Sequence, residues 1–387
     1  MNIEELRNEN DLVDLFCSLA EIPSPSLQEE NVINWICDYC TKNNLKCEKD
    51  DYNNLYITVD ATDTNKKPIL LSSHLDVIGD NSPIIVSLDG NLIKANNRTL
   101  GADDKAGVAN ALYFATKLNN RKDLKHGGLE LHFTRDEESG MTGIKNTDFT
   151  KIQSKYVLVL DSDTLGQFMT SGASYVTAYL KIKAFKGGHS GIDIGDSSRE
   201  NAAKLIADLI AEMPQGVFYS EDDKVITSCN LGGISSGDVN VTNIINTDAE
   251  ATYSIRSSRK DKENELVNLM KEAVEAFNID YKDIATASID FVEKMPMFEE
   301  NSDKFLPELF AKAAAKTGVT PEISSFHAGA ETHIYANKQN THGENFSPYL
   351  VGLATVCNMH SCREYVDYTT MIKGQELLQV LFEEYNK

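Results

Sequence analysis

Five short polar strings in this chain each follow an apolar run or sit in a glycine-containing turn, and this placement constrains the fold more than any other feature. The strings centre on the following residues: His74, Asp103, Glu138, Asp161 and His360. Polar side chains just beyond apolar strands converge where the sheet of an α/β domain opens into a cleft. The sequence therefore predicts an α/β fold whose strand ends gather enough imidazoles and carboxylates for two metal ions.

The pair His74 and Asp76 stands at the end of the apolar run of residues 69–73. Side chains two positions apart in an extended strand point to the same face, so Asp76 can accept the second ring N–H of His74. Such a hydrogen bond fixes the tautomer of a histidine ligand and raises its basicity. We therefore predict that His74 binds metal and that Asp76 orients it.

The other acids divide into ligands and a base. Asp103 can bridge two cations, because each of its oxygens has lone pairs to give. Glu137 and Glu138 are neighbours whose side chains diverge in either kind of secondary structure, so one can hold metal while the other faces the bound water. We assign Glu138 as the ligand and Glu137 as the general base. Asp161 is preferred to Asp163 as a ligand because it directly ends an apolar run.

The order of elements predicts two domains. The clearest strands are residues 55–59, 129–133, 156–160 and 248–257, and the clearest helices are residues 104–117 and 262–277. Early strands and helices alternate, as in an α/β domain with a sheet inside, whereas residues 174–293 follow the βαββαβ order of a ferredoxin-like unit. Because His360 must return to the first domain, this unit is an insertion. We predict a catalytic domain with a mixed sheet over residues 1–173 and 295–387, and a lid or dimerisation domain over residues 174–294.

The composition fits an enzyme and argues against two classes of partner. With 387 residues, 41% of them apolar, the chain can bury two cores. Its 59 acidic and 37 basic residues give a net charge of -22, which argues against nucleic acid and anionic membranes as partners. The N-terminus lacks the basic start and apolar stretch of a signal peptide, and no run approaches the roughly 18 apolar residues that span a bilayer.

The cysteine content predicts a cytoplasmic protein. Seven cysteines, an odd number in a large chain without an export signal, indicate reduced thiols. Cys37 and Cys40 form a Cys-X-X-Cys pair within residues 29–41, where apolar side chains recur at helical spacing. We interpret the pair as helix-packing cysteines, with a redox or zinc site as the alternative.

Together these strings resemble the two-zinc metallo-exopeptidases and deacylases, a family that includes peptidase T (tripeptide aminopeptidase) and Xaa-His dipeptidase. The resemblance starts in the segment from Leu15 to Ser26, passes through all five metal-ligand strings and closes on the final helix after His360. It implies two zinc ions per chain, although cobalt or manganese would accept the same ligands.

The resemblance also implies a role for each site residue. It implies that the first ion is bound by His74 and Asp161, and the second ion by Glu138 and His360. Asp103 is then the ligand that bridges the two ions. Asp76 is then the acid that orients histidine, and Glu137 is the general base. The family places a cis peptide after the bridging acid, here between Asp103 and Asp104.

In the inserted domain the resemblance singles out residues near the substrate. It implies that His189, in a Gly-Gly-His-Ser-Gly turn, polarises the scissile carbonyl, usually across a homodimer interface, and that Asn243 assists there. Arg256 matches an arginine that grips the substrate's C-terminal carboxylate, a task suited to the guanidinium fork. His327 and Gly329 match a His-Ala-Gly loop that lines the pocket of Xaa-His dipeptidases. Their structural alternatives are a turn histidine, a capping asparagine, a surface arginine and an ordinary turn.

We predict metal-dependent hydrolysis of small peptides, by a tripeptide aminopeptidase or a dipeptidase. The string after His360 departs from the His-Gly pattern of tripeptidases and leaves both substrate lengths open. Two other classes remain: an N-acyl amino acid amidohydrolase with the same metals, and a non-catalytic binding module, against which the complete ligand set and Glu137 argue. Four histidines without partner strings are predicted to be ordinary packed or surface residues: His126, His132, His333 and His342.

Overall fold

The computed structural model describes residues 2–222 and 224–387, and the chain divides into two compact units. The first unit contains the chain up to Thr170 with Glu300–Ser324 and Ala330–Lys387. The second unit contains Ser171–Glu299 with Ser325–Gly329. The boundaries lie a few residues from the predicted ones at 173/174 and 294/295.

The segment Ser325–Gly329 belongs to the second unit, whereas the sequence analysis places it in the first. Its contacts give the reason. The N–H of Ala173 donates to the carbonyl of Phe326 over 3.2 Å, and Nε2 of His327 lies 2.7 Å from Oγ of Ser228.

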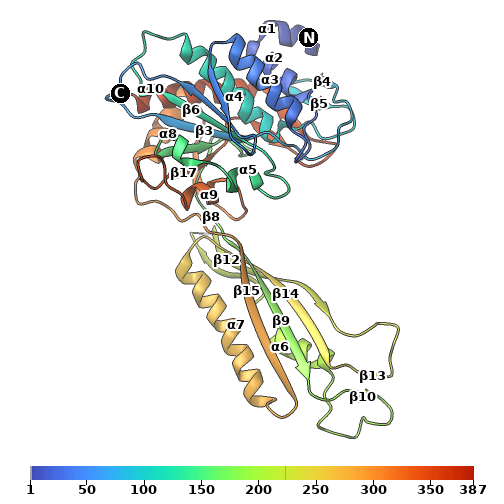
Figure 1. The fold of residues 1–387 in the computed structure, drawn as a ribbon. Coiled ribbons are helices and arrows are strands. Elements are labelled where there is room, and N and C mark those ends of the chain that lie inside the picture. Colours follow the sequence, from blue (N-terminus) through green and yellow to red (C-terminus); the bar gives the residue numbers. More distant parts are fainter. Residues whose placement is uncertain (1, 223) are drawn as a thin grey trace. The chain divides into compact units, whose positions relative to one another are not determined.

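The first unit is built on an eight-stranded mixed sheet (Figure 1). In their order across the sheet the strands are β1 (Lys46–Lys49), β2 (Leu55–Val59), β6 (Leu129–Thr134), β3 (Ile69–His74), β7 (Tyr156–Val159), β17 (Ser347–Val351), β8 (Gln167–Gly172) and β16 (Glu322–Phe326). β6, β3, β7 and β17 run parallel to one another. β3, β6 and β17 are buried along their whole length, as expected for parallel strands covered on both faces.

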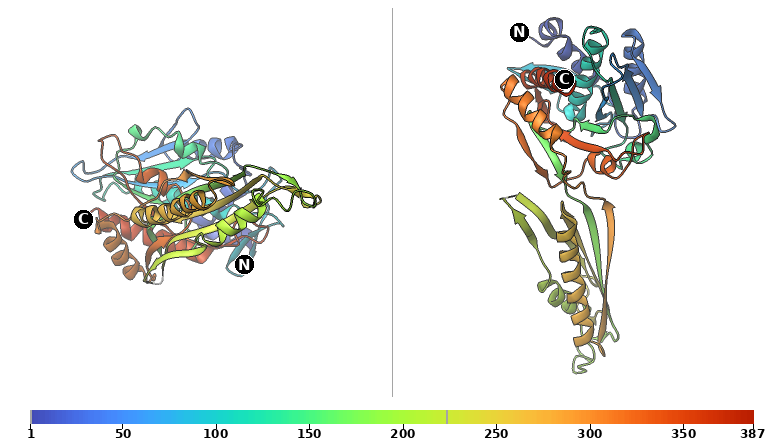
Figure 2. Two further views of the ribbon diagram at one scale, coloured as in Figure 1. Left: turned by 90° about the horizontal axis from the view of Figure 1, so that it is seen from below. Right: turned by 90° about the vertical axis from the view of Figure 1, so that its left-hand side faces the viewer.

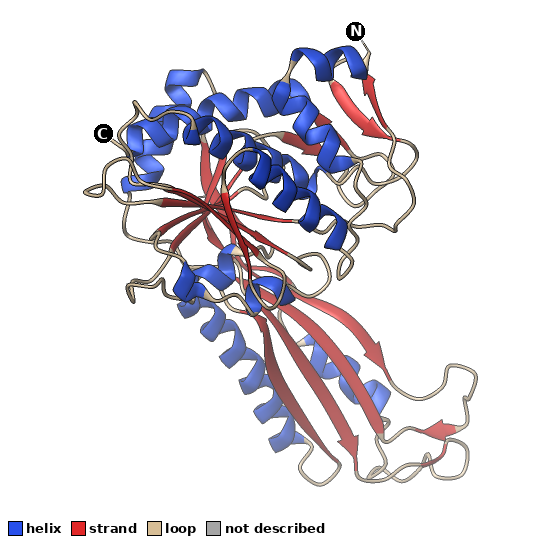
Figure 3. Ribbon diagram, turned by 45° about the horizontal axis from the view of Figure 1, so that its top comes forward, coloured by secondary structure: helices blue, strands red, loops and turns tan. Residues whose placement is uncertain are grey.

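Helices cover both faces of this sheet (Figure 3). The helices of the first unit are α1 (Ile3–Glu9), α2 (Asp11–Ala20), α3 (Glu30–Lys42), α4 (Ala102–Asn119), α5 (Thr142–Lys145), the 3-10 helix η1 (Phe149–Lys151), α8 (Phe305–Thr317), α9 (Thr332–Ala336) and α10 (Tyr368–Tyr385). Gly107 of α4 lies against the hydroxyl of Ser73, and the hydroxyl of Tyr335 in α9 lies 3.0 Å from that of Ser72. Successive strand residues point to opposite faces, so α4 and α9 cover opposite sides of β3.

A second, four-stranded sheet in the first unit carries the loop with His360. Its strands in order are β18 (Thr355–Cys357), β19 (Tyr365–Asp367), β5 (Leu92–Ala95) and β4 (Val86–Asp89), all antiparallel. This sheet is not predicted from the sequence, because strands of three or four residues are too short to show an alternating pattern.

The second unit is a five-stranded antiparallel sheet with α6 (Ala202–Ala211) and α7 (Lys260–Asp280) packed on one face (Figures 1 and 2). Its strands in order are β11 (Gly216–Glu221), β12 (Lys224–Ser235), β14 (Asp248–Ser257), β9 (Tyr175–Ala184) and β15 (Ala285–Met295). The last four strands and the two helices have the ferredoxin-like order, as predicted. β11 is an additional edge strand that the sequence analysis misses, because its residues are mostly exposed and show no alternation.

Cys37 and Cys40 lie on α3, and Sγ of Cys37 is 3.8 Å from Sγ of Cys47 on β1, so these thiols join helix to strand. No helix among the described residues is long and apolar enough to cross a membrane.

Candidate metal centre

Three of the predicted strings meet at one edge of the first unit's sheet. His74 is the last residue of β3, Glu137 and Glu138 follow β6, and Asp161 follows β7. β6, β3 and β7 are parallel neighbours, so their carboxyl ends deliver these side chains to the same place.

Asp103 stands at the start of α4 in a turn held by Glu364. The carboxylate of Glu364 accepts the backbone N–H groups of Gly101 and Ala102, each over 2.9 Å, and of Asp103 over 3.3 Å. Asp103 and Asp104 have non-helical φ and ψ, so this turn is not a regular first turn of a helix, and the carboxylate supplies the acceptors for its N–H groups. Gly101 has φ of +76°, which favours glycine. The peptide bond between Asp103 and Asp104 is cis, as the family resemblance implies.

His360 lies in the loop between β18 and β19, with φ of 59°. Its string also contains Glu364, so one carboxylate ties the loop of His360 to the turn of Asp103, which are far apart in the sequence. This role of Glu364 is not predicted from the sequence. An acid four residues after a predicted ligand was the available signal.

The five predicted ligands form two groups that share Asp103. Nε2 of His74 lies 3.2 Å from Oδ1 of Asp103 and 3.7 Å from Oδ1 of Asp161. Nε2 of His360 lies 3.1 Å from Oδ2 of Asp103 and 3.0 Å from Oε1 of Glu138. Each group contains a different oxygen of Asp103, and ligand atoms of His74, Asp103 and Glu138 also lie within 4.8 Å of one another, so the partition between the two ions stays a prediction.

The two groups fit divalent cations. Ligand atoms bound tetrahedrally to zinc at about 2.0–2.2 Å lie about 3.3–3.6 Å apart, and the separations here run from 3.0 to 3.7 Å. Oε1 of Glu138 is buried and accepts no hydrogen bond from the described residues, although it faces Nε2 of His360. The two atoms approach each other without the alignment of a hydrogen bond, as ligands of one cation do.

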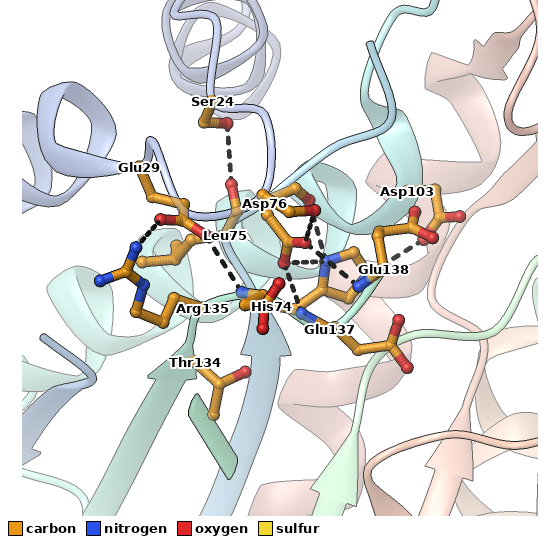
Figure 4. A network of polar contacts seen from close by, with 12 residues as sticks. Ser24, Glu29, His74, Leu75, Asp76, Asp103, Thr134, Arg135, Glu137 and Glu138 are labelled. Atoms are coloured by element: carbon orange, nitrogen blue, oxygen red, sulfur yellow. Dashed lines mark hydrogen bonds and ion pairs between the residues drawn. The ribbon is translucent and has the colours of Figure 1, made fainter. Parts of the chain in front are cut away.

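Asp76 connects the strand ends (Figure 4). Its carboxylate accepts the backbone N–H of Glu137 over 2.9 Å, that of Glu138 over 3.1 Å and the hydroxyl of Ser26 over 2.7 Å. Nδ1 of His74 lies 2.9 Å from the carbonyl oxygen of Asp76 and 3.3 Å from its carboxylate. The carbonyl is therefore the nearer acceptor for His74, while the carboxylate, expected to accept that N–H, holds the turn of Glu137 and Glu138.

The side chains of Glu137 and Glu138 point apart, with Glu138 directed toward Asp103 (Figure 4). This divergence fits the predicted division between a ligand and a base.

The loop before α3 supports the same strand ends. The hydroxyl of Ser24 donates to the carbonyl of Leu75 over 2.8 Å, and Glu29 accepts the N–H of Asp136 over 3.1 Å and lies 2.8 Å from Nη2 of Arg135 (Figure 4). These contacts are not predicted from the sequence, because they join residues more than 50 positions apart.

The site concentrates acids in a buried place, and their pKa values shift accordingly. Burial raises the pKa of Glu137 to about 9, that of Glu138 to about 7 and that of Asp161 to about 6. Hydrogen bonding to Asp103 raises the pKa of His360 to about 9. Burial would lower the pKa of His74, but hydrogen bonds to carboxylates raise it well above its usual value. The protein stripped of cations therefore holds extra protons in the site.

These shifts predict a pH dependence for the protein stripped of divalent ions. Carboxyl and imidazole groups with raised pKa both bind more protons in the folded state than in the unfolded state near neutral pH, so stability falls as the pH rises. Burial would raise the pKa of Asp76, but hydrogen bonds lower it to about 2. Asp76 therefore changes the pH dependence of stability only at acidic pH. We expect the melting temperature of chelator-treated protein to fall between about pH 5.5 and pH 8.5. The gap to metal-loaded protein should widen over that range, because cations replace these protons. A constant gap would contradict this electrostatic description.

In the second unit, His189 and Asn243 lie on paired segments. β10 (Gly188–His189) pairs with β13 (Ile244–Ile245), and the N–H of Ser190 donates to the carbonyl of Asn243 over 3.0 Å. The N–H of Gly191 donates to Nδ1 of His189 over 3.1 Å. The neutral ring therefore carries its proton on Nε2, and this exposed side chain can donate from there.

The other predicted substrate residues gather near the start of β9: Arg256, His327 and Gly329. The guanidinium carbon of Arg256 lies 4.4 Å from the ring centroid of Tyr175. Ser228 pairs with Arg256 across β12 and β14 and contacts Nε2 of His327, whose Nδ1 is buried without a hydrogen bond to the described residues. Of these groups, the guanidinium of Arg256 is the one suited to a carboxylate. Tyr175 and Ser228 are not predicted from the sequence, because neither stands in a recognisable string.

The chain is similar to known proteins in sequence and in fold. Residues 70–384 match the sequence pattern of peptidase family M20/M25/M40. The cytosol non-specific dipeptidase of Escherichia coli (strain K12) is 29% identical over 291 residues, which cover 67% of this chain and 56% of that protein. The crystal structure of aminopeptidase PepT from Bacillus cereus ATCC 10987 has a TM-score of 0.86 at 25% identity and covers 97% of this chain and 98% of that one. Aminoacylhistidine dipeptidase from Vibrio alginolyticus has a TM-score of 0.73 at 22% identity, with 96% of each chain covered. The predicted fold class is confirmed.

Proposed function

Because the chain belongs to peptidase family M20/M25/M40, we propose that it hydrolyses small peptides, as a tripeptide aminopeptidase or a dipeptidase with two zinc ions per chain. The observation that carries this proposal is the pair of ligand groups sharing Asp103, with Glu137 beside them. The likeness to PepT and to two dipeptidases supports the choice of small peptides. A cytoplasmic location stays a prediction from the cysteine content.

The residues that would hold the ions are His74, Asp161 and Asp103 for one, and Glu138, His360 and Asp103 for the other. Held by these residues, two cations would supply a water of lowered pKa and polarisation of the scissile carbonyl. Cobalt or manganese would suit the same nitrogen and oxygen ligands.

The chain's own groups then move the proton. Glu137 takes the proton of the attacking water and delivers it to the leaving amine. Asp76 holds the backbone of Glu137 and Glu138 with one carboxylate, so base and ligand keep a fixed spacing.

The second unit supplies the substrate contacts. His189 donates from Nε2 to the oxyanion that develops as the carbonyl is attacked, and Asn243 assists from the paired segment. Arg256 holds the substrate carboxylate, and the loop of His327 and Gly329 lines the pocket beside it.

The separation of His189 from Arg256 supports a homodimer. β14 and β9 lie side by side and antiparallel. Arg256 of β14 lies beside the start of β9, and Asp248 of β14 lies opposite Lys183, near the end of β9. The segment with His189 follows the end of β9. At about 3.4 Å per residue the two side chains are about 25 Å or more apart, whereas an extended tripeptide spans about 10 Å. One copy of this unit therefore does not bring both to one small substrate.

A second copy supplies the missing partner. Exposed apolar side chains lie near His189 and near Asn243 in the sequence. They are Ile192 (81% exposed) and Ile194 near His189, and Val239 (94% exposed) near Asn243. If these apolar side chains form one patch, they would suit a contact surface between two copies. We propose that His189 of one subunit serves the active site of the other.

Mixed dimers test this arrangement. Inactive Glu137→Ala chains are re-dimerised with inactive His189→Ala chains. With His189 acting in trans, one site of each mixed dimer regains both groups, so about a quarter of wild-type activity should return under random two-fold pairing. Mixed dimers verified by mass that show no recovery would place His189 in its own subunit's site or outside catalysis.

Substrate profiling tests the reaction itself. We expect the zinc-loaded protein to cleave dipeptides or tripeptides with a free α-amine and to leave N-acyl amino acids intact. Cleavage of N-acyl amino acids alone would establish the amidohydrolase instead. Full activity of protein shown by elemental analysis to hold no metal would refute the proposal.

A further inference from the structure

A buried chain of polar side chains lies behind the proposed active site. Its members, in order of contact, are Thr134, Glu331, Ser72, Tyr335 and His132, and all are at most 1% exposed. The hydroxyl of Thr134 donates to Oε1 of Glu331 over 2.5 Å, and that of Ser72 lies 3.4 Å from Oε2. The hydroxyl of Tyr335 lies 3.0 Å from Oγ of Ser72 and 2.5 Å from Nδ1 of His132.

These hydrogen-bonded polar side chains lie in the protein core, where apolar side chains are the usual occupants. A buried carboxyl group costs free energy unless it is hydrogen-bonded, and an apolar core would avoid that cost. A fully satisfied polar network instead specifies one arrangement of the elements it joins. None of its members is a predicted ligand, base or substrate contact.

The attachment points of Glu331 lie directly behind the site. Thr134 stands opposite His74 in the pairing of β6 with β3, and its carbonyl accepts the N–H of Leu75 over 2.8 Å. Ser72 precedes His74 by two residues on β3. Thr134 ends β6, three residues before Glu137.

We propose that Glu331 is a positioning residue that fixes the ends of β3 and β6 relative to each other, and with them the spacing between His74 and Glu137. This inference rests on the proposed function of Glu137 as a base. A sliding movement between the two strands would shift the base relative to the ligand, and misplacement by about 1 Å can cost about 100-fold in rate.

A double-mutant cycle between Thr134 and Glu331 tests the proposal. Thr134→Val keeps the shape and strand preference of the side chain but removes the donor. We expect Thr134→Val and Glu331→Ala each to lower kcat about 10- to 100-fold, with KM within about threefold and both metals bound. The double variant should lose no more than Glu331→Ala alone, because the two changes break one contact. Glu331→Gln, which keeps an acceptor for Thr134, should recover most of the activity.

Two comparisons separate positioning from simple stability. Tyr335→Phe removes a hydroxyl of the same buried chain without touching the Thr134 contact, and should keep kcat within about threefold of wild type, even where its melting temperature falls. Folded, metal-loaded Thr134→Val and Glu331→Ala proteins with unchanged kcat would overturn the proposal, as would additive losses. A wild type that cleaves no amide would instead refute the proposed function.

Discussion

Replacing Glu137 by glutamine should lower kcat by about 100- to 10,000-fold, the contribution expected of a general base, while both metals stay bound. The amide keeps the size of the side chain and the backbone contact with Asp76, but it cannot take a proton from the attacking water. KM should change little, because no substrate contact is removed. The measurement is steady-state kinetics together with elemental analysis of the same preparation.

The matched control is the neighbouring residue. Glu138→Gln makes the same chemical change one position along the chain, yet its Oε1 faces His360 in the second ligand group. We expect this variant to lose metal, and to regain part of its activity when the metal concentration is raised. Metal loss in Glu137→Gln with full metal in Glu138→Gln would reverse the assignment of the pair.

The second large effect is expected at Asp103. Asp103→Asn replaces one of the two oxygens that face His74 and His360 with an amide nitrogen, which carries no lone pair for a cation. The metal content should fall from two ions per chain to one or fewer, and activity should fall to the detection limit, because the variant loses the shared activation of water.

Asp163→Asn is the control for that experiment. Asp163 is exposed two residues after Asp161 and lies in neither ligand group. This variant should keep both ions and at least half of the wild-type activity. Loss of metal in Asp163→Asn but not in Asp161→Asn would show that Asp163, and not Asp161, is the ligand.

The sequence predicts those features that short-range patterns encode. The strands at residues 55–59 and 248–257 have the predicted bounds, because their side chains form apolar runs or alternate strictly. The predicted helix at 104–117 lies within α4, Ala102–Asn119, whose Asp103 and Asp104 have non-helical φ and ψ, so the regular helix begins close to the predicted residue. The ligand strings converge because they follow neighbouring parallel strands.

Features that depend on distant contacts do not appear in the sequence pattern. Glu364 acts on residues more than 260 positions earlier, and Glu331 on Thr134 at almost 200 positions. Asp76 was expected to bind a histidine through its carboxylate, but its carbonyl lies nearer and the carboxylate binds the backbone of the next strand's turn. Such roles follow from which loops meet in space, and no local spacing reveals that.

The position of β17 has a consequence for biosynthesis. This strand lies between β7 and β8, yet residues 347–351 form it, after the whole second unit has been translated. At about 5–20 residues per second, the ribosome takes about 10–40 seconds to reach β17 after completing β7. In that interval the ferredoxin-like sheet can form, while β7 exposes an unpaired apolar edge that can join strands of other chains. We expect that edge to be the part of the nascent protein that most needs a chaperone.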